Sequence, residues 1–186
     1  MAGTAVAMAV SQYEGTLGDP AAFGDFYDET LPRIYGFFLH RVGGNVGAAE
    51  DLTQETFLSA VRELKRGRIG ADPVRWLFGI ARHKLLDHYR RQGRDQGFVV
   101  PWYDGIENDV SLLSLDPDLD GDRARVVDAL GRLPTDQQAV MALRYLDGWS
   151  VPEVASALGR SVHAVESLLA RGRAGFKRGL SEVGHD

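Results

Sequence analysis

The sequence predicts an all-α protein made of two small helical domains joined by a flexible acidic linker. Apolar residues recur at helical spacing through two blocks of the chain, and neither block shows the strict alternation of a β-strand. The stretch between the blocks has no helical period and is rich in Asp and Gly. The second block ends in a helix, a short turn that contains Gly159 and another helix, which is typical of a helix-turn-helix in a four-helix unit.

Length and composition set the outer limits of this prediction. The chain has 186 residues, a formal net charge of −5 and no Cys, so one domain or two small ones are expected. The lack of Cys excludes a disulfide framework and a thiolate metal site. No apolar run approaches the roughly 18 residues that cross a bilayer, so no membrane insertion is expected. The first residues lack the basic flank of a signal peptide.

Charge is distributed unevenly along the chain. Between Asp95 and Asp122 there are eight acidic residues and no Lys or Arg. The flanking blocks are net basic, with 12 Lys and Arg against 9 Asp and Glu in residues 23–94, and 9 against 7 in residues 123–186. The overall negative charge therefore does not argue against nucleic-acid binding by the blocks themselves.

The predicted division follows from these features. It comprises a disordered tail at 1–18, a helical domain at 19–94, an acidic linker at 95–121, a second helical domain at 122–180 and a short tail at 181–186.

Start and stop signals divide the first block into helices. Asp19-Pro20 predicts a helix start, and the apolar periodicity then runs to Gly43-Gly44 with a kink or break at Pro32. Asn45 is expected to cap a second helix, and Asp72-Pro73 repeats the start signal for a third helix.

The third predicted helix has one apolar face and one basic face. The basic face also carries an aromatic residue, and such a surface can bind phosphates and stack on exposed bases; it consists of Arg75, Trp76, Arg82, His83, Arg90 and Arg94. A solvated helix whose arginines pair with nearby acids, and a Trp76 that belongs to the core, remain alternatives.

A metal-dependent enzyme is a further alternative, because His83 and Asp87 are spaced for two ligands on one helix. His83 and His88, however, point about 140° apart on a helix, and no other segment offers matching ligands. The chain also has no phosphate-binding glycine loop and no nucleophile elbow. We therefore expect no catalytic residues, no metal site and no cofactor.

Capping signals also organise the second block. Thr135 with Gln138 predicts a capping box, and Ser150 with Glu153 predicts another at the start of the helix-turn-helix. Ser161 is expected to begin the second helix of that motif. A polar and partly basic second helix favours DNA recognition, although an ordinary helical hairpin would give a similar pattern.

Three ordered motifs resemble those of the extracytoplasmic-function group of sigma factors, within the sigma-70 family of bacterial RNA polymerase subunits. Residues 49–57, AEDLTQETF, are similar to the polymerase-binding helix of that family. Residues 75–91 resemble its helix for the −10 promoter element, and residues 133–158 resemble the segment that leads into its recognition helix. Together the three motifs extend the resemblance over nearly all of the chain from residue 20 to about residue 180.

The resemblance implies three sets of contact residues. Those for the clamp of the largest core polymerase subunit are Asp51, Gln54, Glu55 and Phe57. Those for the −10 element, including capture of a flipped base and strand separation, are Lys65, Arg66, Arg68, Arg75, Trp76, Arg82, His83 and Arg90. Those for the −35 element are Arg160, Ser161, His163, Glu166, Ser167, Arg171 and Arg173.

The implied function is promoter recognition by binding and not by catalysis. The chain would direct core RNA polymerase to particular promoters, assist promoter opening, act in the cytoplasm and be held inactive by an anti-sigma factor. A free-standing helix-turn-helix regulator with an N-terminal helical effector domain is the alternative, and it would bind duplex DNA as a dimer. Glu166 and Leu168 depart from the family pattern, because basic residues are frequent at both positions.

Overall fold

The computed structural model describes residues 17, 19–92 and 121–183. In these ranges every regular element is helical: α2 (Pro20–Arg41), α3 (Val46–Lys65), α4 (Pro73–Gln92), α5 (Gly121–Gly131), α6 (Thr135–Met141), the π-helical turn η2 (Ala142–Leu146), α7 (Val151–Leu158) and α8 (Val162–Val183). The all-α fold class is confirmed. Nearly all of the predicted linker and most of the predicted N-terminal tail lie outside the described residues.

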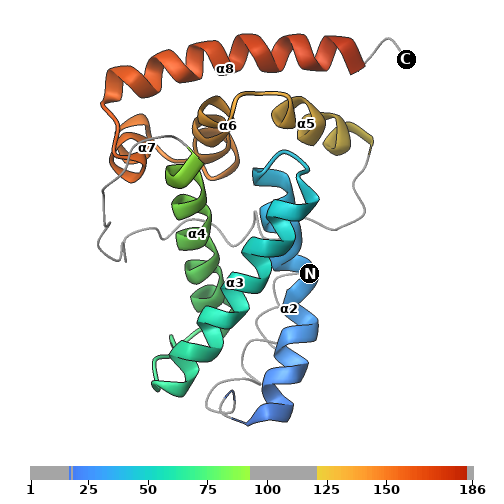
Figure 1. Ribbon diagram of the computed structural model, residues 1–186, viewed down its shortest axis with the longest axis vertical. Coiled ribbons are helices and arrows are strands. Elements are labelled where there is room, and N and C mark those ends of the chain that lie inside the picture. Colours follow the sequence, from blue (N-terminus) through green and yellow to red (C-terminus); the bar gives the residue numbers. More distant parts are fainter. Residues whose placement is uncertain (1–16, 18, 93–120, 184–186) are drawn as a thin grey trace, which may run out of the picture.

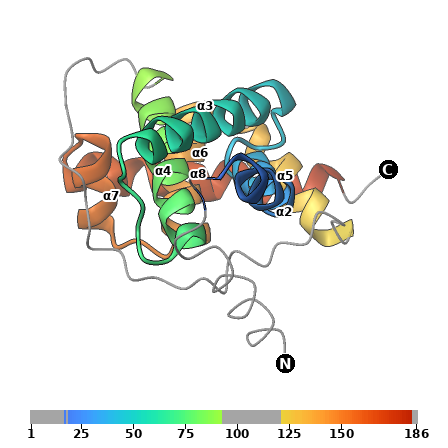
Figure 2. The same cartoon turned by 90° about the horizontal axis from the view of Figure 1, so that it is seen from below.

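The helices form two groups that are stacked end to end. α2, α3 and α4 make the lower group, and α3 contacts both of the others. Seen from below, α3 lies across α2 and α4 (Figure 2). In the upper group α8 is a long rod that lies over α5, α6 and α7 (Figure 1).

The helix α2 is continuous through Pro32, so the predicted break is wrong. Proline removes one helical hydrogen bond, but it sits on the exposed side of α2, where water can replace the missing donor. Buried residues on both sides of it, Phe26, Ile34 and Phe38, are all 0% exposed. Because each half of α2 is held against the same core, packing keeps the two halves in one helix.

Several predicted caps are present and two are not. The Asn45 side chain accepts from the Ala48 amide at 3.0 Å, and Asp72 accepts from the Arg75 amide at 3.0 Å. Asp19 occupies the N-cap position of α2 but forms no side-chain capping bond.

The capping box expected at Thr135 is wrong. α6 begins after Pro134, and no side chain caps it. Gln138, which was expected to complete the box, instead donates to the Leu130 carbonyl at 3.1 Å. The Gln138 side chain is drawn into the core because it satisfies the open carbonyl at the end of α5.

The helix-turn-helix forms as predicted. The Ser150 side chain accepts from the Glu153 amide and the Glu153 carboxylate accepts from the Ser150 amide, which completes the capping box. Gly159 ends α7 in a left-handed conformation with φ 63°. The Ser161 hydroxyl accepts from the Ala164 amide at 3.2 Å at the start of α8.

Glycines on α8 allow close packing against the helices below it. A Cβ at Gly172 would lie 2.9 Å from Met141 Cγ, and one at Gly175 would lie 2.7 Å from Leu133 Cδ2. Glycine generally weakens a helix interior, but α8 continues to Val183 and contacts both α5 and α6.

The two domains are packed against each other. The Arg41 guanidinium at the end of α2 binds the Asp147 carboxylate after η2, with Nη2 to Oδ1 at 2.7 Å and both side chains at most 3% exposed. Nearby, Gly43 lies so close to Gly131 at the end of α5 that a Cβ on either one would overlap the other. The upper end of α4 also contacts α6 and α7.

Candidate protein and nucleic-acid interfaces

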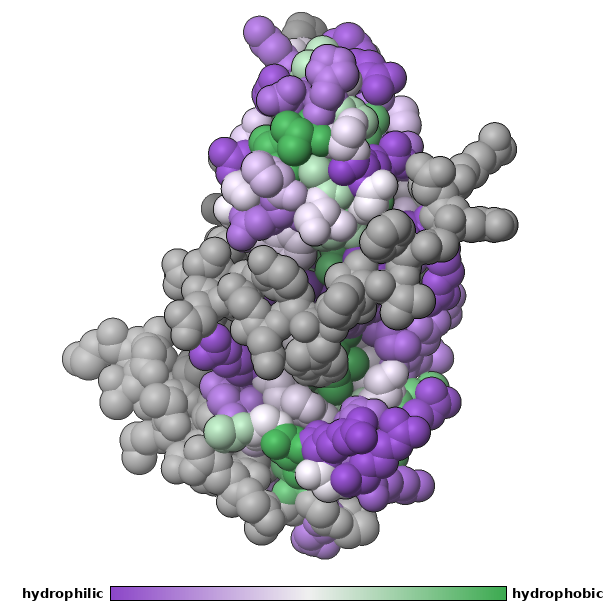
Figure 3. All heavy atoms as spheres, turned by 90° about the vertical axis from the view of Figure 1, so that its left-hand side faces the viewer, coloured by the Kyte–Doolittle hydropathy of each residue, from purple (hydrophilic) through white to green (hydrophobic). Residues whose placement is uncertain are grey.

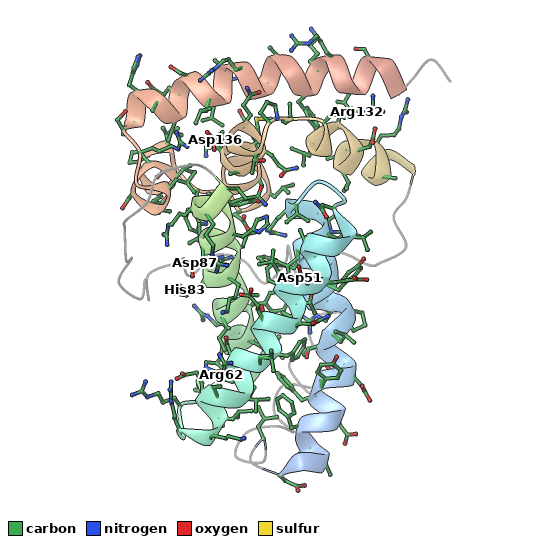
Figure 4. All side chains as sticks on the ribbon, in the orientation of Figure 1. Asp51, Arg62, His83, Asp87, Arg132 and Asp136 are labelled. Carbon is green, nitrogen blue, oxygen red and sulfur yellow. The ribbon has the colours of Figure 1, made fainter. Side chains whose placement is uncertain are left out.

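The acidic face on α3 follows from the helical repeat. Leu52, Thr53 and Thr56 point into the core, which turns Asp51 and Gln54 outward. Figure 4 places Asp51 on the part of α3 nearer the C-terminal domain and Arg62 near its other end. Two exposed polar groups almost one turn apart can meet a basic partner with charge-assisted hydrogen bonds.

Glu55 differs from its neighbours on this face because it already has a cationic partner. Lys84 Nζ on α4 lies 3.3 Å from Glu55 Oε2, and both side chains are only partly exposed. Lys84 could not be predicted as part of this face, since no local sequence pattern links α3 to α4. A protein partner that binds Glu55 has to share or displace this lysine.

A groove of about 390 Å³ lies between α2 and α3 beside the acidic face. Phe57 is only 6% exposed and forms part of its wall, with its ring edge-on to Tyr27 at 4.6 Å. Phe57 was predicted to contact the polymerase, but its ring is packed between the helices. The half-buried residues Tyr27, Leu31 and Tyr35 of the same wall were not predicted, although their spacing of four residues marks one helical face.

The loop between α3 and α4 carries exposed cations. Lys65, Arg66 and Arg68 all lie at the surface, and Gly67 turns the chain with φ 69°. Glu63 lies 2.8 Å from Arg66 and 3.8 Å from Arg68. Exposed ion pairs of this kind are weak, so the arginines remain available to phosphates. Figure 3 shows hydrophilic side chains gathered at this lower end of the molecule.

The predicted basic face of α4 is divided by the structure. Arg75, near the loop, is exposed, whereas Trp76 is half-buried and packs against the core. Gly70 approaches Trp76 so closely that a Cβ there would lie 3.0 Å from Trp76 Cβ. Trp76 thus supports the loop and remains partly exposed.

The other half of this face meets the C-terminal domain. Arg90 donates from Nε and Nη2 to the Ala157 carbonyl of α7, at 2.8 and 2.6 Å. Arg82 Nε is buried and has no acceptor among the described residues. Burial lowers the pKa of Arg82, Asp147 raises it and Arg41 lowers it further. Arg90 therefore contacts the other domain, and Arg82 is half-buried close to it.

The histidines of α4 are partly buried, and burial lowers the pKa of each. Burial lowers the pKa of His83, against a smaller raising effect of Asp87, while Arg90 and Arg82 lower it further. Burial and Arg91 lower the pKa of His88, and Glu55 raises it. Figure 4 shows His83 and Asp87 beside each other along α4. Within the described residues, no three His, Asp or Glu side chains are grouped to hold a metal ion.

The recognition helix α8 presents a mixed face. His163, Glu166 and Arg171 are exposed and Ser167 is half-buried. Leu168 is 7% exposed and belongs to the core, so its departure from the family pattern does not affect the exposed face. Arg173 donates to the Tyr145 hydroxyl at 3.3 Å.

The two residues that precede α8 have structural partners. Arg160 pairs with Asp136 of α6 at 3.0 Å, and Ser161 caps the helix. A phosphate contact from Arg160 would compete with this pair.

None of the described helices combines the length and apolar character needed to cross a bilayer.

Comparison with known families matches both domains. The family model for sigma-70 region 2 matches residues 26–95, and the model for sigma-70 region 4 matches residues 123–174. These ranges contain the acidic face of α3, the basic residues of α4 and the helix-turn-helix. They favour a sigma factor over a free-standing regulator.

Curated relatives cover most of the chain. The RNA polymerase sigma factor CarQ of Myxococcus xanthus is 33% identical over 169 residues, which are 89% of this chain and 93% of CarQ. The ECF RNA polymerase sigma factor BldN of Streptomyces coelicolor is 36% identical over 153 residues, 81% of this chain but only 57% of that longer protein.

A solved complex of the sigma factor RpoE with the anti-sigma factor NepR from Bartonella quintana matches 86% of this chain and 96% of that chain, with 21% identity and a TM-score of 0.45. The fold class, the two family matches and the identity to CarQ over nearly the whole chain lead to one assignment. The chain belongs to the extracytoplasmic-function sigma factors of the sigma-70 family.

Proposed function

We propose that this chain directs core RNA polymerase to particular promoters and assists promoter opening. The observation that carries the proposal is the separation of three surfaces on one chain. An exposed acidic face lies on α3, exposed cations lie on the loop before α4, and a polar face lies on α8. One protein partner and two separate DNA segments fit these surfaces, and an asymmetric two-part promoter provides such segments.

The acidic face is the proposed polymerase contact. Asp51, Gln54 and Glu55 would bind basic side chains of the clamp of the largest subunit, with residues 49–57 as the contact segment. The apolar groove beside them would take an apolar side chain of the same partner. Phe57 forms part of the wall of that groove and would contact the inserted side chain there.

The cationic loop and the first half of α4 are the proposed −10 contacts. Lys65, Arg66, Arg68 and Arg75 would hold phosphates, which position the strand without reading its sequence. The exposed part of Trp76 would stack on an unpaired base. His83 lies farther along α4, and Arg82 and Arg90 join the set only when they are released from the C-terminal domain.

The exposed face of α8 is the proposed −35 contact. His163, Glu166, Ser167 and Arg171 would reach base edges, and Glu166 could accept a hydrogen bond from cytosine N4. Arg160, Ser161 and Arg173 would bind phosphates at the start and the side of the helix.

The remaining parts of the proposal follow from membership of the family. The chain works by binding, because the polymerase supplies the chemistry, and it uses no cofactor of its own. It acts in the cytoplasm and has an anti-sigma factor as a third partner. Residues 19–94 and 122–180 are the proposed functional domains; the family matches to residues 26–95 and 123–174 support these limits.

Charge reversal on α3 tests the polymerase contact. Asp51→Arg should weaken binding to core RNA polymerase about tenfold or more, because loss of a charge-assisted hydrogen bond costs about 1.5–3 kcal/mol. Asp25→Arg reverses another exposed carboxylate, on α2 and outside the proposed contact, and serves as the matched control. Binding is measured by titration of labelled chain with core polymerase.

Run-off transcription from a genomic promoter library tests the function itself. The unaltered chain and Asp25→Arg should support initiation, and Asp51→Arg should lose most of it. A folded chain that supports no initiation from any promoter would overturn the proposed function.

A further inference from the structure

The contact between the domains depends on a buried ion pair. Arg41 Nε and Nη2 donate to both Asp147 oxygens, at 2.7 to 3.2 Å, and Arg41 Nη1 donates to the Phe37 carbonyl. The Arg41 guanidinium also lies over the Phe37 ring at 3.9 Å. Tyr89 on α4 donates to the Arg41 carbonyl at 2.8 Å, which ties α4 to the same point. This geometry orients the arginine toward the C-terminal domain with little freedom.

The same contact covers cations that DNA would need. Arg90 donates two hydrogen bonds to the Ala157 carbonyl, and its side chain is only 13% exposed. Arg82 is half-buried near the charges of Asp147 and Arg41, and its buried Nε has no acceptor among the described residues. A buried guanidinium donor without an acceptor is unfavourable. An anion that reached Arg82 would supply the missing acceptor and lower the free energy of this side chain.

We propose that the Arg41–Asp147 contact is an autoinhibitory latch, which keeps the free chain closed and withholds the Arg82–Arg90 half of α4 from DNA. The effect on DNA rests on the proposed −10 role of α4. Opening separates Asp147 and Ala157 from α4 and frees two guanidinium groups for phosphates. The exposed loop cations, by contrast, are available in both states.

Substitution of Gly131 can open the latch without changing the Arg41–Asp147 pair or the proposed DNA contacts Arg82 and Arg90. The three atoms nearest to a Cβ at Gly131 all belong to the backbone of Gly43 in the other domain. Gly131→Ala therefore places its closest clash across the contact between the domains, while Ala itself favours α5. Gly24→Ala makes the same chemical change on α2, where nothing lies within 4 Å, and is the matched control.

The distance between the domains is the first measurement. The chain has no Cys, so Ala21→Cys and Ala174→Cys, both at exposed positions, allow two spin labels to be attached. Pulsed electron paramagnetic resonance then measures the distance between the two labels. The closed chain and Gly24→Ala should give one narrow distribution. Gly131→Ala should lengthen and broaden it, and Asp147→Asn should do the same by leaving Arg41 without its counter-charge. Unchanged distances in both variants would overturn the latch.

Binding of a short random-sequence single-stranded DNA is the second measurement, made on the full chain by fluorescence anisotropy over a range of salt concentrations. Release of two cations should tighten binding by Gly131→Ala and steepen its salt dependence by about 1.4, at roughly 0.7 for each phosphate contact. An open variant that binds like Gly24→Ala would show that the seam does not withhold α4, and the proposal would be wrong. An open variant that binds DNA more tightly but gives no transcription with core polymerase would support the latch and count against the proposed function.

Discussion

At the scale of single residues, the capping box at Ser150 stabilises the start of the helix-turn-helix. The Ser150 hydroxyl and the Ser150 amide both donate to the Glu153 carboxylate. The pKa of Glu153 is lowered mainly by the hydrogen bond from the Ser150 side chain. Ser150→Ala should lower the free energy of unfolding by about 1 kcal/mol, measured by urea denaturation followed by circular dichroism. Ser156→Ala, at an exposed position in the same helix, should change it by less than about 0.5 kcal/mol. Equal losses in both variants would show that the cap is not the cause.

The two histidines of α4 predict how stability depends on pH. Burial lowers the pKa of His83 and His88 in the folded chain, so the unfolded chain binds more protons as the pH falls below the ordinary value of about 6.5. Stability should therefore rise with pH in that range and be lost on acidification from about pH 7.5 to about pH 5.5.

Urea unfolding at the two pH values tests this dependence. The double variant His83→Gln, His88→Gln should lose less stability than the unaltered chain, and His163→Gln, at an exposed position on α8, should behave like the unaltered chain. The burial argument would fail if the double variant kept the full pH dependence.

At the scale of elements, α8 packs through its glycines. Gly172→Ala would place a Cβ 2.9 Å from Met141 Cγ. Overpacking of this kind costs about 1–3 kcal/mol, which exceeds the gain of about 1 kcal/mol from better helix propensity. Gly172→Ala should therefore lower the thermal midpoint, whereas Gly24→Ala on open α2 surface should raise it. A raised midpoint for Gly172→Ala would show that α8 can move away from α6.

Sequence patterns predicted the elements whose signals are local. The capping residues Asn45, Asp72 and Ser150 each bond to an amide three residues later, so the pattern contains both partners. Sequence patterns gave wrong predictions where a contact with a distant residue determines the local structure. Pro32 does not break α2, because packing on both sides holds it, and Gln138 serves the end of α5 and not a capping box.

At the scale of the whole molecule, the ion pair between the domains contributes to stability. Asp147→Asn leaves Arg41 buried without a counter-charge, which costs about 3–5 kcal/mol. We expect a lower urea midpoint, and separate transitions of the two domains in calorimetry. Asp128→Asn removes a carboxylate from the half-exposed pair with Arg132 and should change stability by less than about 1 kcal/mol. Matching midpoints for the two variants would contradict a stabilising role for the seam.

The sequence by itself determined the helical class, the helix-turn-helix and the family, because periodicity, caps and ordered motifs are carried by residues close together in the chain. It also placed the exposed residues Asp51, Arg75 and His163 on the outer faces of their helices. Only the tertiary structure decided that the two domains dock. Arg41 and Asp147 are separated by 106 residues, and no local pattern records which distant charges will share a buried seam. Because the two domains dock, one half of the basic face of α4 is covered by the C-terminal domain, while the half next to the loop is exposed to solvent.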